Sequence, residues 1–325
     1  MLHDRIFRIT KHKHFNSCCL EVFRYQSKNV SVYKAFLDQL GINPLNINEC
    51  RKIPFLPISF FKTRKILADE QTESLVFTSS GTTGINKSKH FLPDIRLYEK
   101  SFVNSFKLFY GEPSDYHILA LLPDYLEREN SSLVFMVNKL IKLSESPESG
   151  FYLHNLEELA LKLKKLQEGN KMVLLIGVTY ALLDLAEKFP MPLSNTIVME
   201  TGGMKGKREE ITRSRLHEIL KDKLGTAEIH SEYGMTELLS QCYSSGNGIF
   251  RAPPWMKIMV REFNDPFKID AETGSGGINI IDLANIYSCC FIETKDLGHL
   301  HHGGSFEITG RFDNSDTRGC NLMVS

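Results

Sequence analysis

Short β-rich runs alternate with amphipathic helical stretches between about residues 74 and 235, and this alternation constrains the fold more than any other feature. We expect strands near residues 75–78, 117–122, 172–178, 196–200 and 227–230, and helices near 94–109, 130–143, 154–167 and 205–224. Strands that alternate with helices form parallel sheets flanked by those helices. The sequence therefore predicts an α/β fold.

Charge and cysteine content exclude several classes of protein. The 39 Lys and Arg residues balance 39 Asp and Glu residues, so no net basic charge favours a nucleic-acid partner. The seven cysteines are odd in number and lack a Cys-x-x-Cys pair, which argues against a disulfide framework and a zinc site. No apolar stretch approaches the roughly 18 residues of a membrane span. We expect a cytoplasmic protein with reduced cysteines and no membrane span.

A glycine- and hydroxyl-rich segment follows the first expected strand. It consists of Ser79, Ser80, Gly81, Thr82, Thr83 and Gly84, with Lys87 at its far end. Glycines let backbone N–H groups approach a polyphosphate, hydroxyls add donors and the ammonium adds charge. The segment is not a P-loop, because Asn86 precedes the lysine. It suits ATP, although an ordinary Ser/Thr/Gly turn also explains these residues when they are taken alone.

The chain divides into three expected parts. Residues 1–70 carry apolar side chains at helical spacing and are expected to form a helical N-terminal cap. Residues 71–240 hold the alternating pattern and the Ser/Thr/Gly segment, and would form an α/β nucleotide-binding core. Residues 241–325 contain closely spaced strands and Gly-rich turns. These features predict a smaller β subdomain that ends in a cysteine-bearing tail.

Four further motifs follow in order, at residues 200–203, 232–237, 294–298 and 310–320. The first two come after expected strands, as the Ser/Thr/Gly segment does, so all three should meet at the carboxyl edge of the parallel sheet. Together the five motifs resemble the core motifs of the adenylate-forming superfamily, from about Pro54 to the C-terminus. Residues 54–62, 122–133 and 318–320 look most like the acyl-protein synthetases that supply fatty acids to bacterial bioluminescence reductases.

The resemblance assigns phosphate and metal ligands. Residues 79–84 and Lys87 would hold the β- and γ-phosphates of ATP, and Thr236 would contact the α-phosphate. Glu237 would coordinate Mg²⁺, a hard cation that favours carboxylate and phosphate oxygens. Adenylation then needs positioning and charge stabilisation rather than a catalytic triad.

The resemblance also implies a nucleoside site. Gly202 and Gly203 would allow close approach to adenine, and Tyr233 would stack on it. Asp296 would accept hydrogen bonds from the ribose hydroxyls, and Arg311 would contact the ribose from the other side. Taken alone, Asp296 and Arg311 would equally suit a surface turn and an ordinary ion pair. Their position in the ordered set favours the nucleotide role.

The C-terminal end departs from the wider superfamily. Its ligases carry a further C-terminal domain with a catalytic lysine, whereas this sequence stops at Ser325, shortly after Arg311. We therefore expect no swinging C-terminal domain, which disfavours a standard acyl-CoA ligase. Cys320 stands where acyl-protein synthetases carry an acyl-accepting cysteine, and nearby Arg318 would lower its thiol pKa. The alternative is a free cysteine on a tail.

These observations predict an ATP- and Mg²⁺-dependent acyl-protein synthetase. It would activate a carboxylic acid, expected to be a fatty acid, as acyl-AMP, carry the acyl group as a thioester on Cys320 and pass it to a partner such as an acyl reductase. Two alternatives stay open. One is a phenylacetate-CoA-ligase-like or carrier-loading ligase that uses a separate C-terminal domain, and the other is an inactive nucleotide- or acyl-binding scaffold. The set Thr236, Glu237, Asp296 and Arg311 argues against a scaffold.

Overall fold

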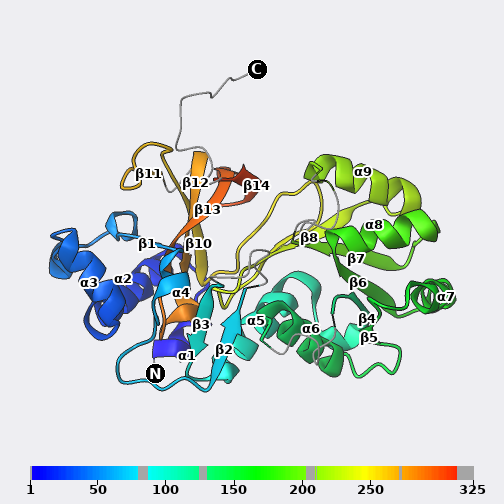
Figure 1. Cartoon of the computed structure of the whole chain (residues 1–325), viewed down its shortest axis with the longest axis horizontal. Coiled ribbons are helices and arrows are strands. Elements are labelled where there is room, and N and C mark those ends of the chain that lie inside the picture. The colour runs from blue at the N-terminus through cyan, green and yellow to red at the C-terminus, as the bar shows by residue number, and fades with distance from the viewer. Residues whose placement is uncertain are drawn as a thin grey trace.

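The computed structural model describes residues 2–79, 87–123, 130–202, 209, 211–270 and 273–312. Two sheets lie side by side in Figure 1, with an antiparallel hairpin of β2 (Leu75–Thr78) and β3 (Lys89–Leu92) between them. One sheet is flanked by the helices of the middle of the chain, and the other is built from the C-terminal strands. The site described below lies where these three units meet.

The first sheet confirms the predicted parallel α/β core. Its strand order is β5 (Gly150–Phe151), β4 (Tyr116–Leu121), β6 (Met172–Val178), β7 (Thr196–Thr201), β8 (Ile229–Tyr233) and β9 (Cys242–Ser244). Strands β5 to β8 pair in parallel, and β9 is antiparallel to β8. Strands β4 and β6 read as almost continuous apolar runs because helices cover the sheet.

Helices lie on both sides of this sheet. They are α5 (Ile95–Tyr110), η3 (Pro113–Asp115), α6 (Ser132–Leu143), α7 (Leu156–Leu166), α8 (Thr179–Lys188) and α9 (Arg213–Leu224). In Figure 1, α8 and α9 lie above the sheet and α5 and α6 below it. Helix α9 begins later than predicted, because the Thr212 hydroxyl accepts a hydrogen bond from Arg215 N and caps it. Gly225, with φ +59°, ends it as predicted.

Helix α8 was not predicted from the sequence. It starts at Thr179, directly after the last residue of β6, so no turn residues separate the two elements. A continuous apolar run of this kind does not distinguish a long strand from a strand followed by a buried helix.

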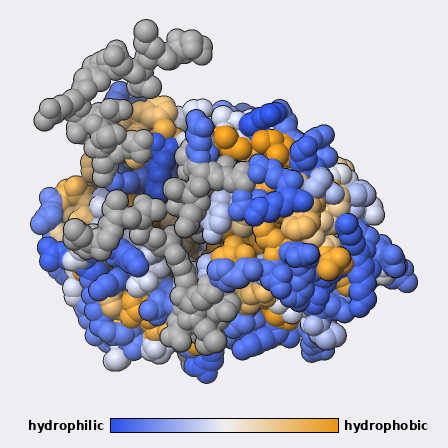
Figure 2. Space-filling view, turned by 45° about the vertical axis from the view of Figure 1, so that its right-hand side comes forward, coloured by the Kyte–Doolittle hydropathy of each residue, from blue (hydrophilic) through white to orange (hydrophobic). Residues whose placement is uncertain are grey.

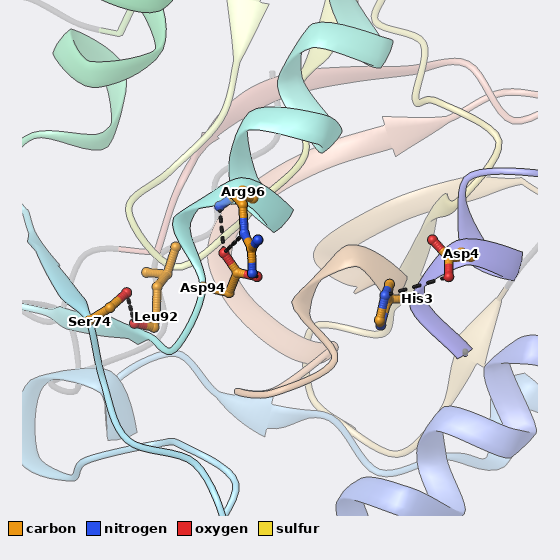
Figure 3. Close-up of polar contacts among 6 residues, drawn as sticks. All are labelled: His3, Asp4, Ser74, Leu92, Asp94 and Arg96. Atoms are coloured by element: carbon orange, nitrogen blue, oxygen red, sulfur yellow. Dashed lines mark hydrogen bonds and ion pairs between the residues drawn. The ribbon is translucent and has the colours of Figure 1, made fainter.

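The start of α5 is fixed directly beyond the hairpin. Asp94 is the N-cap, and its carboxylate accepts a hydrogen bond from Arg96 N at 3.0 Å, as Figure 3 shows. The Arg96 guanidinium also pairs with this carboxylate and lowers its pKa. At the other strand, the Ser74 hydroxyl donates to the carbonyl of Leu92. Only two residues, one of them the N-cap Asp94, therefore separate the end of β3 from the start of α5.

The second sheet has the order β1 (Leu56–Pro57), β13 (Phe291–Leu300), β12 (Gly274–Asp282), β10 (Met256–Arg261) and β11 (Ile269–Asp270), and β14 (Phe306–Arg311) also pairs with β13. Strand β1 is parallel to β13, and the other pairs are antiparallel. Gly277 makes room for Arg261, because an added Cβ would lie 2.4 Å from the guanidinium carbon. The short helix η4 (Leu283–Asn285) connects towards β13.

N-terminal helices pack on this second sheet. They are α1 (Leu2–Ile6), α2 (His12–Asn29), α3 (Ser31–Gln39), η1 (Pro44–Asn46), η2 (Cys50–Lys52) and α4 (Phe60–Thr63). The rings of Phe23 and Tyr33 lie 5.8 and 5.9 Å from that of Phe291 in β13. The Gln26 side chain is fully buried and donates to the carbonyl of Ile286 at 2.8 Å. The first helices thus cover strands from the far end of the sequence.

The surface in Figure 2 is mostly hydrophilic, with hydrophobic patches separated by hydrophilic residues. Within the described ranges, no helix is both long enough and apolar enough to cross a membrane.

Candidate active site

The phosphate loop is carried by the β2–β3 hairpin. Thr78 pairs with Lys89, and beyond them Ser79 N donates to Ser88 O while Ser88 N donates to the Ser79 hydroxyl, both at 3.0 Å. Lys87 is exposed. Ser80, Gly81, Thr82, Thr83 and Gly84 lie outside the described residues, so their predicted phosphate contacts stay a prediction.

The prediction that the phosphate loop follows a strand of the parallel sheet was wrong. We predicted that the strand before it belongs to the parallel sheet, whereas β2 pairs antiparallel with β3 in a separate sheet. A four-residue apolar run suits a hairpin strand as well as a parallel strand, and the second strand follows the glycine-rich turn.

Two other motifs meet at the carboxyl edge of the parallel sheet, as predicted. Thr201 at the end of β7 pairs with Glu232 near the end of β8. Gly202 follows β7, is exposed and has φ +50°, a conformation that favours glycine. Tyr233 is the last residue of β8 rather than part of the loop after it. Gly203 and Cys320 lie outside the described residues.

Tyr233, Asp296 and Arg311 form a constellation that joins the two sheets. The Tyr233 hydroxyl donates to Asp296 Oδ2 at 2.7 Å, and Arg311 Nε lies 3.7 Å from Asp296 Oδ1. Asp296 and Arg311 are paired across β13 and β14, so Asp296 lies in a strand and not in a surface turn. Its side chain is 17% exposed, against 68% for Arg311. One oxygen of the Asp296 carboxylate therefore accepts a hydrogen bond from the buried Tyr233 hydroxyl, and the other oxygen faces the exposed Arg311 guanidinium.

The Tyr233 ring itself is largely covered. It is 9% exposed and lies 5.8 and 5.7 Å from the rings of Phe250 and Phe306. Burial, followed by the charge of Asp296, raises the pKa of the Tyr233 phenol, so it stays a hydrogen-bond donor at neutral pH. Stacking of adenine on this ring stays a prediction.

Glu237 is a buried carboxyl group at the base of the phosphate loop. Its side chain is 5% exposed, and burial raises its pKa. A hydrogen bond from Ser88 and the positive charges of Arg311 and Lys62 act in the opposite direction and favour the carboxylate. Groups at the end of the hairpin and at the end of β14 therefore both act on Glu237 in the turn after β8.

A buried histidine fixes the backbone of this turn. His90 in β3 is 1% exposed, and its Nδ1 lies 2.8 Å from Thr236 O while its Nε2 lies 2.9 Å from Asn285 Oδ1. Asn285 Nδ2 in turn donates to Glu237 O at 2.8 Å. Burial lowers the pKa of His90 to about 4, so the imidazole is neutral near pH 7 and donates its single N–H to one of the two oxygens. Thr236 itself is half-buried.

His90 and Asn285 were missed by sequence reasoning. They lie 195 positions apart and act on main-chain carbonyl groups, which no motif spacing records. Gly234 was noted only as part of its motif. An added Cβ there would lie 2.5 Å from Glu232 Oε1, and Glu232 is itself buried and accepts a hydrogen bond from Thr201.

The donor set suits magnesium held together with phosphate. Among the described residues, no group of three or more His, Cys, Asp or Glu side chains is arranged to hold a metal ion. Mg²⁺ is usually bound by one or two carboxylates and by substrate phosphates, and it keeps several waters. The single buried carboxylate of Glu237, next to the hairpin that carries the predicted phosphate loop, matches that pattern.

Comparison with known families decides the relationship. The sequence matches the LuxE acyl-protein synthetase family over residues 8–325. The chain belongs to this family. The match confirms the resemblance drawn from the ordered motifs. No curated protein sequence matches the chain.

Solved structures show the fold of this LuxE-family chain. It matches 2-hydroxyisobutyryl-CoA ligase in complex with 2-HIB-AMP with a TM-score of 0.70 and 12% identity, over 93% of this chain and 68% of that one. MenE from Bacillus subtilis with ATP and magnesium matches with a TM-score of 0.54 and 17% identity, over 76% of this chain and 52% of that one. MatB from Rhodopseudomonas palustris matches with a TM-score of 0.54 and 15% identity, over 74% of this chain and 48% of that one.

The chain thus spans about half the length of the MenE and MatB chains. At these identities the likeness shows a shared fold, that of the large domain of adenylate-forming ligases. It confirms the predicted fold class.

Proposed function

We propose that the chain activates a carboxylic acid with ATP as acyl-AMP and then transfers the acyl group to a protein cysteine. The observation that carries this proposal is the position of Glu237. Ser88 of the phosphate-loop hairpin hydrogen-bonds to this buried carboxyl group, and the charge of Arg311, which also faces Asp296, acts on it. A metal ligand, a phosphate-loop hairpin and a ribose acceptor in one place match what adenylation requires.

In the adenylation step, a carboxylate oxygen of the acid attacks the α-phosphorus of ATP. An O–P bond forms, the bond from the α-phosphorus to the bridging oxygen breaks, and pyrophosphate leaves. Thr236 would contact the α-phosphate, while residues 79–84 and Lys87 would hold the β- and γ-phosphates. Magnesium bound with Glu237 would supply positive charge to these phosphates.

The nucleoside would be held from the other side. Asp296 would accept hydrogen bonds from the ribose hydroxyls, with its carboxylate held in place by Tyr233. Arg311 would contact the ribose, and Gly202 and Gly203 would lie against adenine. The Tyr233 contact matters because an oriented acceptor does not have to reorganise when the substrate binds.

We propose Cys320 as the acyl acceptor. The thiolate would attack the carbonyl carbon of acyl-AMP, so that a C–S bond forms, the C–O bond to AMP breaks and AMP leaves. Of the seven cysteines, the six within the described residues are all buried. Burial raises the pKa of the Cys242, Cys289 and Cys290 thiols, which disfavours the reactive thiolate. These three side chains are therefore poor acceptors.

The family description, acyl-protein synthetase, supports an acyl substrate and a protein acceptor. We propose a fatty acid as the substrate and an acyl reductase as the partner, as the sequence resemblance implies. Loading of a carrier or of CoA through a separate domain is the alternative enzyme. A scaffold without chemistry is the alternative outside catalysis.

One labelling experiment tests the transfer step. The protein is incubated with ATP, Mg²⁺ and radiolabelled fatty acids, and label on the protein is measured before and after hydroxylamine treatment. We expect Cys320→Ser to abolish hydroxylamine-labile label while leaving acid-dependent pyrophosphate exchange intact.

Cys50→Ala is the matched control, because a hydrogen bond from Cys19 lowers the pKa of the Cys50 thiol and makes it the rival acceptor. We expect this variant to keep its label. Label that survives in Cys320→Ser and disappears in Cys50→Ala would contradict the assignment.

A further inference from the structure

Two lysines outside the predicted site residues lie near charged groups of the site, Lys62 near Glu237 and Lys295 near Arg311. Lys62 belongs to α4 and Lys295 to β13. The charge of Lys62 acts both on the Glu237 carboxyl group and on the Lys295 ammonium, and the charge of Arg311 acts on the same two groups. Lys62, Lys295 and Arg311 therefore form a group of neighbouring cations, and two of them, Lys62 and Arg311, act on a buried carboxyl group.

The backbone explains why these side chains come together. Strand β1 runs parallel to β13, and the ladder continues with a hydrogen bond of 2.9 Å from Ile58 N to Glu293 O. Helix α4 begins two residues later, while Lys295 lies two residues beyond Glu293. The carbonyl of Lys295 accepts a hydrogen bond of 2.7 Å from Phe312 N, directly after Arg311.

Helix α4 is also anchored against the phosphate-loop hairpin. The Phe61 side chain is buried, and its ring meets the edge of the His90 ring at a centroid distance of 5.8 Å. His90 lies two residues from Ser88, which hydrogen-bonds to Glu237. Lys62, the next residue after Phe61, is exposed, and its charge acts on the Glu237 carboxyl group. Its position is thus set by buried neighbours while its ammonium stays available.

The space beside Lys295 is open to a ligand. A cavity of about 330 Å³ lies between residues 57–59 and residues 293–295, and Phe312 and Arg261 also line it. Arg261 faces Glu293 at 3.9 Å, and Arg311 faces Asp296 at 3.7 Å. Burial lowers the pKa of Lys295, and repulsion from Lys62 and Arg311 lowers it further. An anion placed among these cations would remove that repulsion.

We propose that the ammonium groups of Lys62 and Lys295 bind phosphate oxygens of ATP beside Glu237. The inference rests on the proposed function for the identity of the ligand. In the adenylation step the two lysines would stabilise negative charge on the phosphates as the bond to pyrophosphate breaks. Lysine suits this role because its ammonium is a compact point charge on a flexible stem.

The test is equilibrium binding of Mg-ATP and of adenosine, measured by calorimetry without any carboxylic acid. We expect Lys62→Gln and Lys295→Gln each to weaken ATP binding about tenfold or more, the scale of a lost hydrogen bond to a charged group. Adenosine, which lacks phosphate, should bind as it does to the wild type. Lys62→Arg should restore most of the ATP affinity.

Arg64→Gln is the matched control, since Arg64 is an exposed cation two residues from Lys62 and is not among the charges that shift the pKa of Glu237 or Lys295. It should leave both affinities unchanged. ATP affinity within about twofold of wild type in both lysine variants would overturn the inference, as would an equal loss for ATP and adenosine.

The same measurements separate the inference from the proposed function. If the lysine variants lose ATP affinity but the wild type supports no acid-dependent exchange, the phosphate site stands and the proposed function fails. If exchange proceeds and Lys62→Gln and Lys295→Gln bind ATP normally, the inference alone fails. A wild-type protein that does not bind ATP would overturn both.

Discussion

The hydrogen bond between Tyr233 and Asp296 connects residues that lie on different sheets. Tyr233→Phe keeps the ring packing with Phe250 and Phe306 and removes the donor that orients the Asp296 carboxylate. We expect the KM for ATP to rise about tenfold or more with a smaller change in kcat, because a hydrogen bond to a charged group contributes about 1.5 kcal/mol or more. Steady-state pyrophosphate exchange at varied ATP measures both constants.

Tyr180→Phe is the control for this prediction. Tyr180 lies in α8 and is half-buried, and no described residue hydrogen-bonds to its hydroxyl. It should leave the KM for ATP unchanged. An unchanged KM in Tyr233→Phe as well would show that the bond to Asp296 does not position the nucleotide.

At the scale of elements, strand β3 holds the turn that carries Thr236 and Glu237 through His90. Burial lowers the folded-state pKa of His90 to about 4, below its ordinary value of 6.5, so the unfolded chain takes up this proton at higher pH than the folded chain. The stability that neutral His90 contributes is complete above pH 6.5 and is lost as pH falls towards 4. The loss amounts to at most about 3 kcal/mol.

His90→Gln should therefore flatten the pH dependence. We expect the difference in unfolding free energy between wild type and this variant to shrink as pH falls from about 6.5 to about 4, measured by urea denaturation at several pH values. His14→Gln, a change at an exposed histidine of α2, should run parallel to the wild type. Parallel curves for His90→Gln would show that His90 titrates normally in the folded protein.

For the whole molecule, the sequence predicts what local periodicity encodes. Helices α5, α6 and α7 and strands β4, β6 and β7 lie close to their expected ranges, because each has its own apolar pattern and caps. The place of β2 was wrong, since its short apolar run does not reveal its partner. The covering of the second sheet by α2 was not predictable either, because Gln26 and Ile286 are 260 residues apart.

The candidate site was also predictable in part from the sequence, where its residues belong to motifs. The ordered motifs singled out Tyr233, Glu237, Asp296 and Arg311. The structure joins Tyr233, Asp296 and Arg311 through side-chain contacts, and the charge of Arg311 acts on Glu237. Positioning groups such as His90 carry no motif, because their function depends on which carbonyl groups the fold places beside them.

Acid-dependent exchange of radiolabelled pyrophosphate into ATP tests the central claim most directly, because it reports acyl-AMP formation before any transfer to cysteine. We expect the wild type to show exchange that requires both Mg²⁺ and a carboxylic acid from a panel of chain lengths. Glu237→Gln should reduce the rate by about 10²-fold while the fold, followed by circular dichroism, stays intact. A wild-type protein that binds ATP but shows no exchange with any acid, or a Glu237→Gln variant as active as the wild type, would contradict the account.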